Sequence, residues 1–362
     1  MSKKRDVSLK WQDLEKRAGN DVFLSWSWIG NWLEIISGNV FLVEAVVNEQ
    51  VVGLGFFVEK TRKIFGLFTI KQWHLHRAGN EKQDQIWIEH NDFLLDANIS
   101  DSVREEMVRS ICNFDPLVQE IIIGLSTSDV LLSCAKSFRS KSLQLRPLID
   151  ALAYRVDTKE TYVDEVLSKN TRSQVIRSEK LLNRLGNLDF YVVTGTKEVQ
   201  KSLESIAKLH IDRWDKTNEG SGFTNPSFKK FHHLITSDKG NGIAEVSILS
   251  LNQKPLGYLL NYIYKNKVYF YLSALTTFEE NKIKVGMTLH TKAIQHYIDI
   301  GIYSYDFLGG DARYKKSLSN KKYLLSLGCF QRNNFLLRLE NEFKDYKAKL
   351  KGVLFKVLTS IQ

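Results

Sequence analysis

Near its C-terminal end the chain reads Tyr305-Asp306-Phe307-Leu308-Gly309-Gly310-Asp311-Ala312-Arg313-Tyr314-Lys315-Lys316. An apolar strand leads into a glycine turn, and acidic, aromatic and basic side chains follow the turn at once. Because glycine adds no side-chain bulk, the backbone here can approach a ligand closely. The polar residues after the turn can bind anions, donate protons and position an acceptor. This segment is therefore expected to form part of an active site.

A helix and two strands are expected around this segment. Upstream of it, Lys284-Val285-Gly286-Met287-Thr288-Leu289 has the pattern of a glycine-bearing entry to a helix. Residues 286–300 carry apolar side chains at helical spacing, and Gly301 stands where a helix commonly ends. Strands are predicted on both sides, over 268–275 and 302–308. Strand, helix, strand and polar cluster together predict one active site.

The composition is that of an ordinary globular protein. The 362 residues suffice for two domains, and 43% of them are hydrophobic. The three cysteines, Cys112, Cys134 and Cys329, are far apart, which favours a reducing compartment and gives no zinc-ligand spacing. The basic start lacks an apolar signal core, and no apolar run approaches the roughly 20 residues that span a bilayer. A cytoplasmic location is expected, with peripheral contact to the inner membrane as an alternative.

The net charge of +10 favours anionic partners. Phosphorylated cofactors, nucleotide sugars, tRNA and acidic lipid surfaces all belong to this class. The alternative interpretation is that the charge only keeps the protein soluble.

Two segments, 41–60 and 245–258, share one pattern. In each, an apolar arm meets an Asn-led turn, at Asn48 and Asn252, and a glycine falls five residues after the asparagine. Apolar arms around such a turn predict a hairpin. The second half continues as a meander over 258–275. The two halves of the chain are therefore expected to be alike.

The domain boundary is placed near Pro147-Leu148-Ile149-Asp150, because proline breaks regular structure. This gives an N-terminal domain over 1–150, a C-terminal catalytic domain over 151–332 and a tail over 333–362. Residues 162–186 have the pattern of a charged amphipathic helix. Its basic face is either solvated surface or a row of positive charges at the border of a binding site for an anionic substrate.

Two aromatic clusters in the first half are assigned to packing, with a surface position as the alternative for the histidines of the second. Trp28 and Trp32 are four residues apart, so one helix face could carry both, and a core role is favoured. In Trp73-His74-Leu75-His76, alternation predicts a strand with both histidines on one face. No third metal ligand is near, so no metal site is predicted.

The tail from 335 to 358 carries apolar residues at three- and four-residue steps and lysines over much of the rest. This pattern predicts a basic amphipathic helix. Docking on the protein's own core is the favoured interpretation. Attachment to an anionic membrane surface or to a partner is the alternative.

Several segments, in their order along nearly the whole chain, resemble the CelD-like branch of the GNAT acyltransferases, which is linked to cellulose and exopolysaccharide biosynthesis. They are the terminal motif 306–315, the N-terminal tryptophan cluster, Leu167–Arg172, and His210–Trp214 with Gly220, Gly222 and Phe223. Two fused GNAT-like halves are also similar to the FemX-type enzymes that extend peptidoglycan cross-bridges. The resemblance implies an α+β fold of two tandem GNAT-like domains, each a mixed, mostly antiparallel sheet flanked by helices, plus a C-terminal helix.

The resemblance also implies an N-acetyltransferase that uses acetyl-CoA or another acyl-CoA. The acceptor would be a small-molecule amine, namely an amino sugar or nucleotide sugar of surface polysaccharide. In that fold, two neighbouring strands part and hold the pantetheine arm; here they would be 268–275 and 302–308. The pyrophosphate would rest on the helix start near Gly286, where amide groups and the helix dipole favour an anion. The expected cofactor-binding residues are Ala274, Leu275, Lys282, Lys284, Gly286 and Met287.

The usual superfamily loop has Arg or Gln and then two glycines separated by one residue. Here only Gly286 is present, with Lys282 and Lys284 beside it. This departure leaves open an aminoacyl-tRNA donor, as in FemX-type relatives, and then nucleic acid would be a partner. A non-catalytic binding protein with the GNAT fold is the third alternative.

Acyl transfer to an amine needs removal of a proton, stabilisation of an oxyanion and departure of a thiolate. His210 shares a helix face with Arg213 and Trp214 and is interpreted as the base or as a packing residue. Asp306 would orient a base or bind the amine, unless it only pairs with a nearby cation. The candidate catalytic residues are His210, Asp306, Asp311, Tyr314 and Lys315, and the candidate substrate-binding residues are Arg172, Arg213, Trp214 and Phe223.

Within the terminal motif, the alternative for Asp311 is a turn or helix cap. Tyr314 is expected to protonate the leaving thiolate. Lys315 matches a FemX-type lysine assigned to the oxyanion. The first half has no comparable cluster and is expected to be structural or to bind the acceptor.

Overall fold

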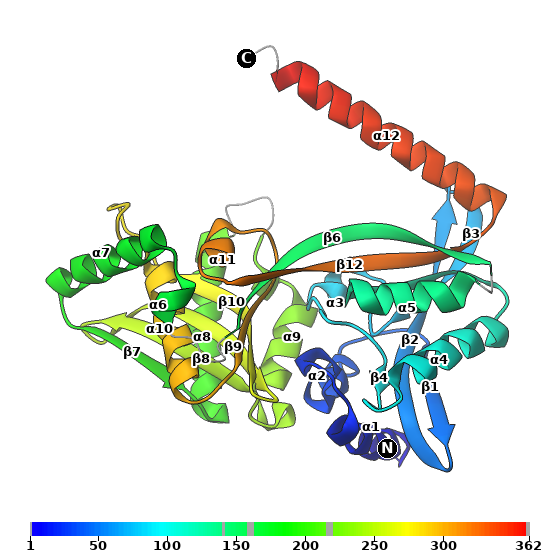
Figure 1. Ribbon diagram of the computed structural model, residues 1–362, viewed down its shortest axis with the longest axis horizontal. Coiled ribbons are helices and arrows are strands. Elements are labelled where there is room, and N and C mark those ends of the chain that lie inside the picture. Colours follow the sequence, from blue (N-terminus) through cyan, green and yellow to red (C-terminus); the bar gives the residue numbers. More distant parts are fainter. Residues whose placement is uncertain (1, 140–141, 158–162, 215–219, 360–362) are drawn as a thin grey trace.

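One continuous sheet runs through the whole molecule (Figure 1). The protein is seen here as a computed structural model that describes residues 2–139, 142–157, 163–214 and 220–359. The sheet has 12 strands in the order β1-β2-β3-β5-β12-β6-β11-β10-β9-β8-β7, with β4 paired to β2. The strands are β1 (Val40–Val47), β2 (Gln50–Ile64), β3 (Phe68–Leu75), β4 (Leu94–Leu95), β5 (Val118–Thr127), β6 (Leu143–Asp157), β7 (Leu188–Val193), β8 (Ala244–Leu251), β9 (Lys254–Tyr264), β10 (Lys267–Leu275), β11 (Ser304–Gly309) and β12 (Lys321–Arg332).

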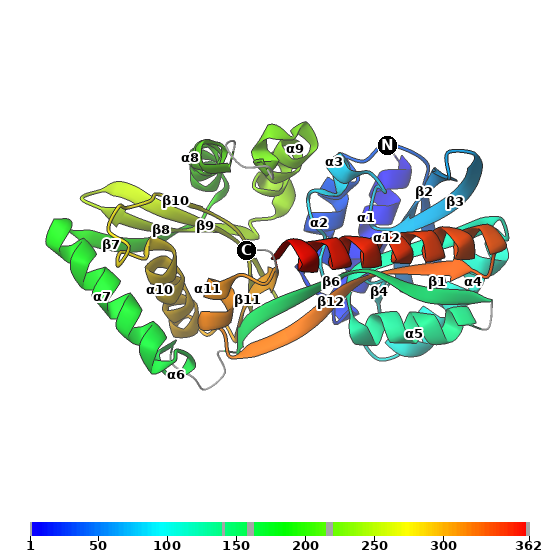
Figure 2. The ribbon, with the colours of Figure 1, turned by 90° about the horizontal axis from the view of Figure 1, so that it is seen from above.

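Helices cover both faces of this sheet (Figure 2). They are α1 (Ser2–Arg17), α2 (Trp26–Trp32), α3 (Glu81–Asp84), α4 (Ser100–Phe114), α5 (Ser128–Arg139), α6 (Val163–Val166), α7 (Lys169–Leu185), α8 (Thr196–Trp214), α9 (Pro226–Ile235), α10 (Val285–Asp299), α11 (Arg313–Ser317) and α12 (Phe335–Thr359). Short 3₁₀ turns lie at Val22–Leu24, Gly222–Thr224 and Asp238–Gly240.

The two halves repeat one arrangement, as the sequence suggested. In the first, β1, β2 and β3 are antiparallel neighbours, and β5 joins β3 in parallel after helix α4. In the second, β8, β9 and β10 are antiparallel, and β11 joins β10 in parallel after helix α10. Both predicted hairpins are confirmed. Asn48-Glu49 and Asn252-Gln253 have φ of 48° and 64° and of 49° and 65°, values that suit the tight turns of two-residue hairpins.

The halves exchange their last strands. β6 follows β5 in the chain but pairs with β11 and β12, and β12 follows β11 but pairs with β5. Pro147, which the sequence suggested as a breaker, lies inside β6 opposite Gly328, beside the point where the register between β6 and β12 shifts. The domain boundary at residue 150 stays a prediction, and one unbroken strand crosses it.

Three apolar cores hold the helices to the sheet. One is shared by both halves, because α1 and α2 contribute Trp11, Trp28 and Trp32 to the same cluster as residues of α8, α9, β8 and β9. The packing role expected for the tryptophans is thus confirmed. A second core lies under α4 and α5, and a third under α7 and α10. The shared core fixes the second half against the first, and the site described below lies where they meet.

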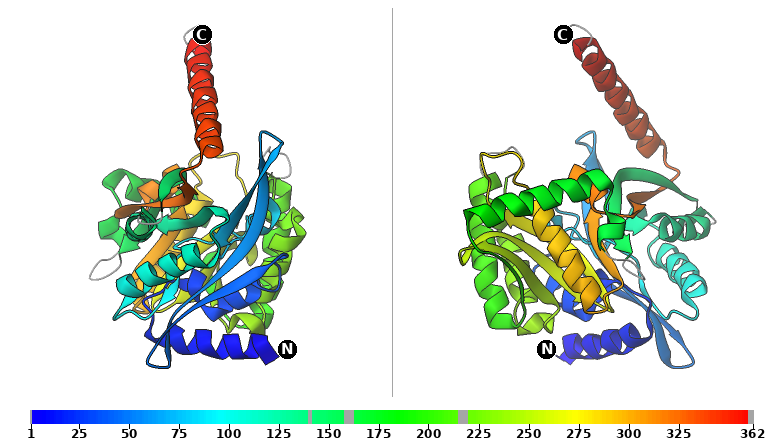
Figure 3. Two further views of the ribbon diagram at one scale, coloured as in Figure 1. Left: turned by 90° about the vertical axis from the view of Figure 1, so that its right-hand side faces the viewer. Right: turned by 60° about the vertical axis from the view of Figure 1, so that its left-hand side comes forward.

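Two helix predictions need correction. The expected helix over 162–186 is broken into α6, which ends at Val166, and α7, whose N-cap residue Ser168 accepts a hydrogen bond from Thr171 N. The described side chains of helix α12 dock in its first half, where Leu337 packs against Ile64 and Ile70, and Glu340 and Asp345 pair with Arg62 and Arg146. The rest of α12 extends away from the body (Figures 1 and 3). Within the described residues, no helix is long and apolar enough to cross a membrane.

Candidate functional site

Strands β10 and β11 part to form a wedge. They pair only through Lys267↔Ser304, Val268↔Tyr305 and Tyr269↔Asp306. Beyond Tyr269, β10 continues to Leu275 while hydrogen bonded to β9 on its other edge. Among the described residues, no strand pairs with residues 270–275 of β10 on the edge that faces the wedge. The parting expected from the sequence is confirmed, and it leaves backbone groups available to a ligand.

A cavity of about 980 Å³ occupies this wedge. Its walls come from β10, the starts of α7 and α10, the last turn of α8, and α11. The first half contributes Gln85 and Trp87 from the loop after α3. The volume lies at the upper end of what small-molecule and cofactor sites enclose.

The N-terminus of α10 opens into the cavity through Lys284, Gly286 and Met287. Lys284 is the N-cap residue, and no side chain caps the helix. A Cβ atom on Gly286 would lie 2.9 Å from Leu275 Cδ1, so glycine lets the helix start close to the end of β10. Amide groups at a helix start without a side-chain cap, the helix dipole and a lysine together favour an anion at this place.

A strained turn closes the wedge at the end of β11. Leu308 has φ of +61°, a conformation that costs a branched residue energy, and the register between β11 and β6 shifts there. The N–H of Leu308 donates to Asp306 Oδ1 (2.7 Å), and the N–H of Gly309 donates to Glu89 Oε2 (2.8 Å). From the other side, Lys315 Nζ donates to Gly309 O (2.6 Å) and, more weakly, to Leu308 O (3.4 Å). Two carboxylates and one ammonium group therefore hold this turn.

Lys315 is a buried lysine that lines the cavity. Burial lowers the pKa of Lys315, while the negative charges of Glu89 and Asp306 partly oppose that shift. An ammonium group has three N–H donors, and two carbonyl oxygens accept from this one. The third donor is available to a ligand in the cavity.

Glu89 is the functional candidate that the sequence did not reveal. It is buried in the loop between α3 and β4 and lies against Gly309, where a Cβ atom would be 3.3 Å from Glu89 Oε1. Burial raises the pKa of Glu89 to about 7, although the Gly309 hydrogen bond opposes the shift. A carboxyl group that titrates near neutrality can accept a proton from an amine. Only the fold brings this residue to the turn that closes the wedge, where it lies behind Gly309 and outside the cavity lining. Its flanking sequence carries no motif.

Aromatic and imidazole groups line the rest of the cavity. Tyr314 stacks on His290, with ring centroids 5.3 Å apart, and burial raises the pKa of Tyr314. Burial lowers the pKa of His290 to about 3, so its ring is neutral. His210 Nδ1 hydrogen bonds with Ser221 Oγ (2.8 Å), and burial, followed by the charge of Arg213, lowers the pKa of His210. Both histidines are neutral at pH 7.

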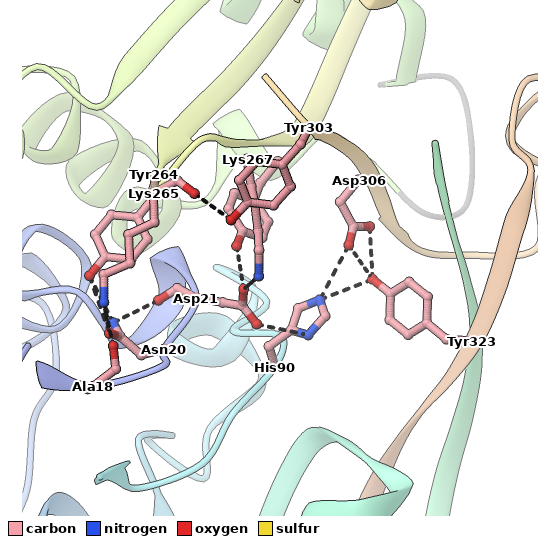
Figure 4. Close-up of polar contacts among 11 residues, drawn as sticks. Ala18, Asn20, Asp21, His90, Tyr264, Lys265, Lys267, Tyr303, Asp306 and Tyr323 are labelled. Carbon is pink, nitrogen blue, oxygen red and sulfur yellow. Dashed lines mark hydrogen bonds and ion pairs between the residues drawn. The ribbon is translucent and has the colours of Figure 1, made fainter. Parts of the chain in front are cut away.

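A cluster of buried and partly buried polar groups lies just where the strands part (Figure 4). His90 lies between two carboxylates, 3.4 Å from Asp21 and 3.6 Å from Asp306. Tyr323 donates to both oxygens of Asp306 at 2.8 and 2.7 Å, and Tyr269 donates to Asp21. Burial alone would lower the pKa of His90, but the hydrogen bond to Asp306 and the charge of Asp21 raise it to about 9. We call Asp21, His90, Tyr269, Asp306 and Tyr323 the junction cluster.

Not every predicted site residue reaches the wedge cavity. His210, Tyr314, Lys315, Leu275, Lys284, Gly286, Met287, Arg213 and Trp214 line it. The side chains outside its lining are Asp306, Asp311, Ala274, Lys282, Arg172 and Phe223.

Local structure accounts for several of these positions. Asp306 belongs to the junction cluster and pairs with His90, not with the nearby Arg313 or Lys315. Asp311 accepts a hydrogen bond from Tyr154 Oη (2.6 Å), and Ala312, not Asp311, is the N-cap residue of α11. Ala274 and Phe223 are buried in the apolar core that the two halves share.

The corresponding wedge of the first half is filled by its own chain. There β3 and β5 pair in parallel only from Lys71↔Val118 to His74↔Ile122. Asn91 Nδ2 donates to Leu75 O (2.8 Å) and Gly124 O (3.1 Å), so this side chain bridges the two strands beyond their paired part. Asn91 is itself positioned by His76, whose Nδ1 hydrogen bonds with Asn91 Oδ1 at 2.9 Å. The other ring nitrogen of His76, Nε2, accepts a hydrogen bond from Phe56 N. Of the two wedges, the second carries the large cavity.

Comparisons with known proteins agree with this geometry. Residues 169–316 match the model of the acetyltransferase (GNAT) domain. That span contains α7, α8, β10, α10 and most of α11, which form most of the cavity walls. No curated protein matches the chain.

Solved structures show the same fold over nearly the whole chain. FemX is 13% identical, with a TM-score of 0.59, over 92% of this chain and 98% of its own. The C-terminal domain of a proposed lysylphosphatidylglycerol synthetase from Agrobacterium fabrum is 10% identical, with a TM-score of 0.58, over 91% and 92%. L-PGS from Bacillus licheniformis is 9% identical, with a TM-score of 0.52, over 92% and 95%. The predicted fold class, a mixed α+β protein with a GNAT-like sheet flanked by helices, is confirmed, whereas the CelD-like branch stays a prediction.

Proposed function

We propose that this protein is an acyltransferase that holds a thioester donor in the wedge between β10 and β11 and transfers the acyl group to an amine. The observation that supports the proposal most directly is the parting of the strands beside an uncapped helix N-terminus. The free edge of β10 suits the amide groups of a pantetheine arm, and the start of α10 with Lys284 suits a pyrophosphate. Acetyl-CoA, or another acyl-CoA, is the donor that this arrangement fits.

The side chains at the closed end of the wedge fit the three chemical needs of the reaction. Glu89, with its pKa near 7, accepts the proton of the attacking amine. Lys315 presents an N–H to the oxygen that becomes negative as the carbonyl carbon turns tetrahedral. Tyr314, whose raised pKa keeps it protonated, supplies a proton to the departing sulfur.

The acceptor side of the cavity suits an amino sugar or a nucleotide sugar. Trp87 and Trp214 both line it, and the flat apolar face of an indole ring packs well against a sugar ring. Arg213 lines it too and offers a planar guanidinium group to a phosphate. A role in surface polysaccharide synthesis follows from this acceptor class.

An aminoacyl-tRNA donor is the second candidate. FemX, a structure described as the C-terminal domain of a lysylphosphatidylglycerol synthetase, and L-PGS share the fold, and the chain carries a net charge of +10. Either donor makes the protein a transferase of cell-envelope synthesis. A binding protein without activity is the third candidate, and it predicts that Asp311→Ala, Tyr314→Ala and Lys315→Ala together leave cellular function intact.

Ligand-dependent stability separates the first two candidates. A ligand that binds only the folded state raises the melting temperature. We expect CoA and acetyl-CoA to do so, and Lys284→Ala to reduce the shift more than Lys282→Ala, because only Lys284 lines the cavity. If CoA compounds leave the melting temperature unchanged while tRNA binds with a steep dependence on salt, the aminoacyl-tRNA donor replaces the thioester donor.

A further inference from the structure

Two exposed apolar segments, far apart in the sequence, lie together on one side of the molecule. The first is the turn between β2 and β3, where Phe65, Leu67 and Phe68 are 45%, 78% and 47% exposed. Turns at hairpin ends are normally polar or glycine-rich, so an apolar tip of this kind points to a contact outside the chain.

The second segment is the outward face of α12. Phe335, Leu339, Phe343 and Tyr346 follow one another at steps of three or four residues and are 43% to 68% exposed. Such spacing gives a single apolar stripe along the helix. We call this stripe and the β2–β3 turn the apolar edge.

The two parts of the apolar edge touch. The rings of Phe65 and Phe343 meet edge to face, with centroids 6.1 Å apart. Figure 3 shows the β2–β3 hairpin and α12 projecting from the same side of the body. The base of α12 is fixed by Arg62, whose Nη2 lies 2.7 Å from Glu120 and 2.8 Å from Glu340. The hairpin and the helix therefore present one surface.

Charge is distributed unevenly along α12. Its acidic residues lie in its first half, and two of them, Glu340 and Asp345, are paired with Arg62 and Arg146 of the body. Asp345 is the last acidic residue of the chain, and Lys347, Lys349, Lys351 and Lys356 follow it. Lys347 Nζ lies 4.6 Å from the Phe343 ring centroid, so a lysine flanks the apolar stripe.

We propose that the apolar edge binds the surface of an anionic lipid bilayer. Aromatic and aliphatic side chains flanked by lysines are what an interfacial segment needs, because the apolar groups enter the headgroup region while the cations meet acidic lipids. No residue of the apolar edge lines the wedge cavity. The proposal does not depend on the proposed reaction.

A second copy of this chain is a less suitable occupant. Two α12 helices packed along their stripes would bring two sets of lysines together without acidic partners after Asp345. Like charges at such a contact oppose association, whereas an acidic membrane neutralises them.

The test is vesicle flotation of the full chain. Vesicles of phosphatidylcholine alone are compared with vesicles containing phosphatidylglycerol. We expect binding to the acidic vesicles only, weakened by roughly 100-fold when Lys347, Lys349, Lys351 and Lys356 are changed to Gln. Leu67→Ser with Phe343→Ser should also lower binding, while Leu132→Ser, at a 63% exposed site on α5, should not. Melting temperatures report whether the variants fold.

Two kinds of outcome would overturn the proposal. The first comes from flotation: either the original chain and the lysine variant float equally, or the original chain floats with neither kind of vesicle. The other is a concentration-dependent dimer in solution that Phe343→Ser abolishes, which would assign the apolar edge to a second copy. Light scattering measures this second outcome on the same samples.

Discussion

Glu89 and Lys315 lie on opposite sides of one peptide unit, that between Leu308 and Gly309. The carboxylate accepts from its N–H, and the ammonium group, held mainly by Gly309 O, also contacts its C=O. Burial moves both pKa values toward neutrality, upward for the acid and downward for the base. Groups whose pKa values are shifted in opposite directions are typical of sites of proton transfer, and this is why the proposed chemistry is assigned to the end of the wedge.

Glu89 as proton acceptor predicts a particular pH profile. As pH rises through about 7, kcat/KM should rise because Glu89 loses its proton. As pH rises further, kcat/KM should fall again because Lys315 loses its proton, with a midpoint below pH 10.5. Glu89→Gln keeps an acceptor for Gly309 N–H, so we expect a loss of roughly 100-fold in kcat/KM and disappearance of the acidic limb. Glu49→Gln, in an exposed turn, is the matched control. A limb below pH 6.5 that His210→Phe removes would assign the base to His210 instead.

Lys315 should matter for rate and not for folding. Lys315→Met removes the donor aimed at the oxyanion, and we expect kcat to fall roughly 100-fold to 1000-fold. Because burial disfavours the charged form of Lys315, the apolar variant should be at least as stable in thermal unfolding. The exposed neighbour Lys316, changed to Met, should leave both quantities unchanged. An unaltered kcat in Lys315→Met would remove this residue from the mechanism.

At the scale of elements, the junction cluster sets where β10 and β11 part. Tyr269 and Asp306 form the last pair of the parallel ladder, and both side chains belong to the cluster. Charge pairing with His90 and the hydroxyl groups of Tyr269 and Tyr323 fix the two strands at that point. The cavity begins one residue later, with Phe270.

Loosening this cluster should affect both stability and donor binding. Tyr323→Phe leaves Asp306 and His90 with fewer partners, so we expect a loss of about 1 to 3 kcal/mol in the free energy of unfolding. Because the wedge is less well fixed, KM for the donor should rise more than kcat falls. Tyr191→Phe, on the exposed surface of β7, is the control. Denaturant unfolding and initial-rate kinetics measure the two effects, and an unchanged KM would make the cluster purely structural.

Local elements could be predicted from the sequence, and their assembly could not. The hairpins around Asn48 and Asn252, the helix at Gly286 and the strand before Gly309 depend on turn chemistry and periodicity within a few residues. The exchange of β6 and β12 depends on pairings between residues such as Leu152 and Leu324, which no local pattern encodes. For the same reason Tyr314 and Lys315 could be predicted as site residues, because they lie in the motif itself. Glu89 could not, because its contact with Gly309 joins residues 220 positions apart in the chain.

At the scale of the whole molecule, buried histidines should make stability depend on pH. Burial lowers the pKa of His74 and His76 to about 4 and of His232 and His290 to about 3. Below pH 6.5 the unfolded chain binds protons at these groups and the folded chain does not, so stability falls as pH falls. His90 acts in the opposite sense, because its folded pKa of about 9 adds stability as pH falls from 9 to 6.5.

The expected result is a maximum of stability near neutral pH. From pH 7.5 to 5.5, each of the four neutral histidines should cost about 1 kcal/mol of unfolding free energy. Urea unfolding at a series of pH values measures the curve. His76→Gln should reduce the loss on the acid side, and a stability that stays flat down to pH 5 would contradict the burial of these rings.

The exchanged strands have a consequence for fragments of the chain. Each half lends its last strand to the other, so neither half has a complete sheet of its own. A fragment ending at Asp157 would lack β12 and expose the edges of β5 and β6, and such unpaired edges recruit another chain to cover them.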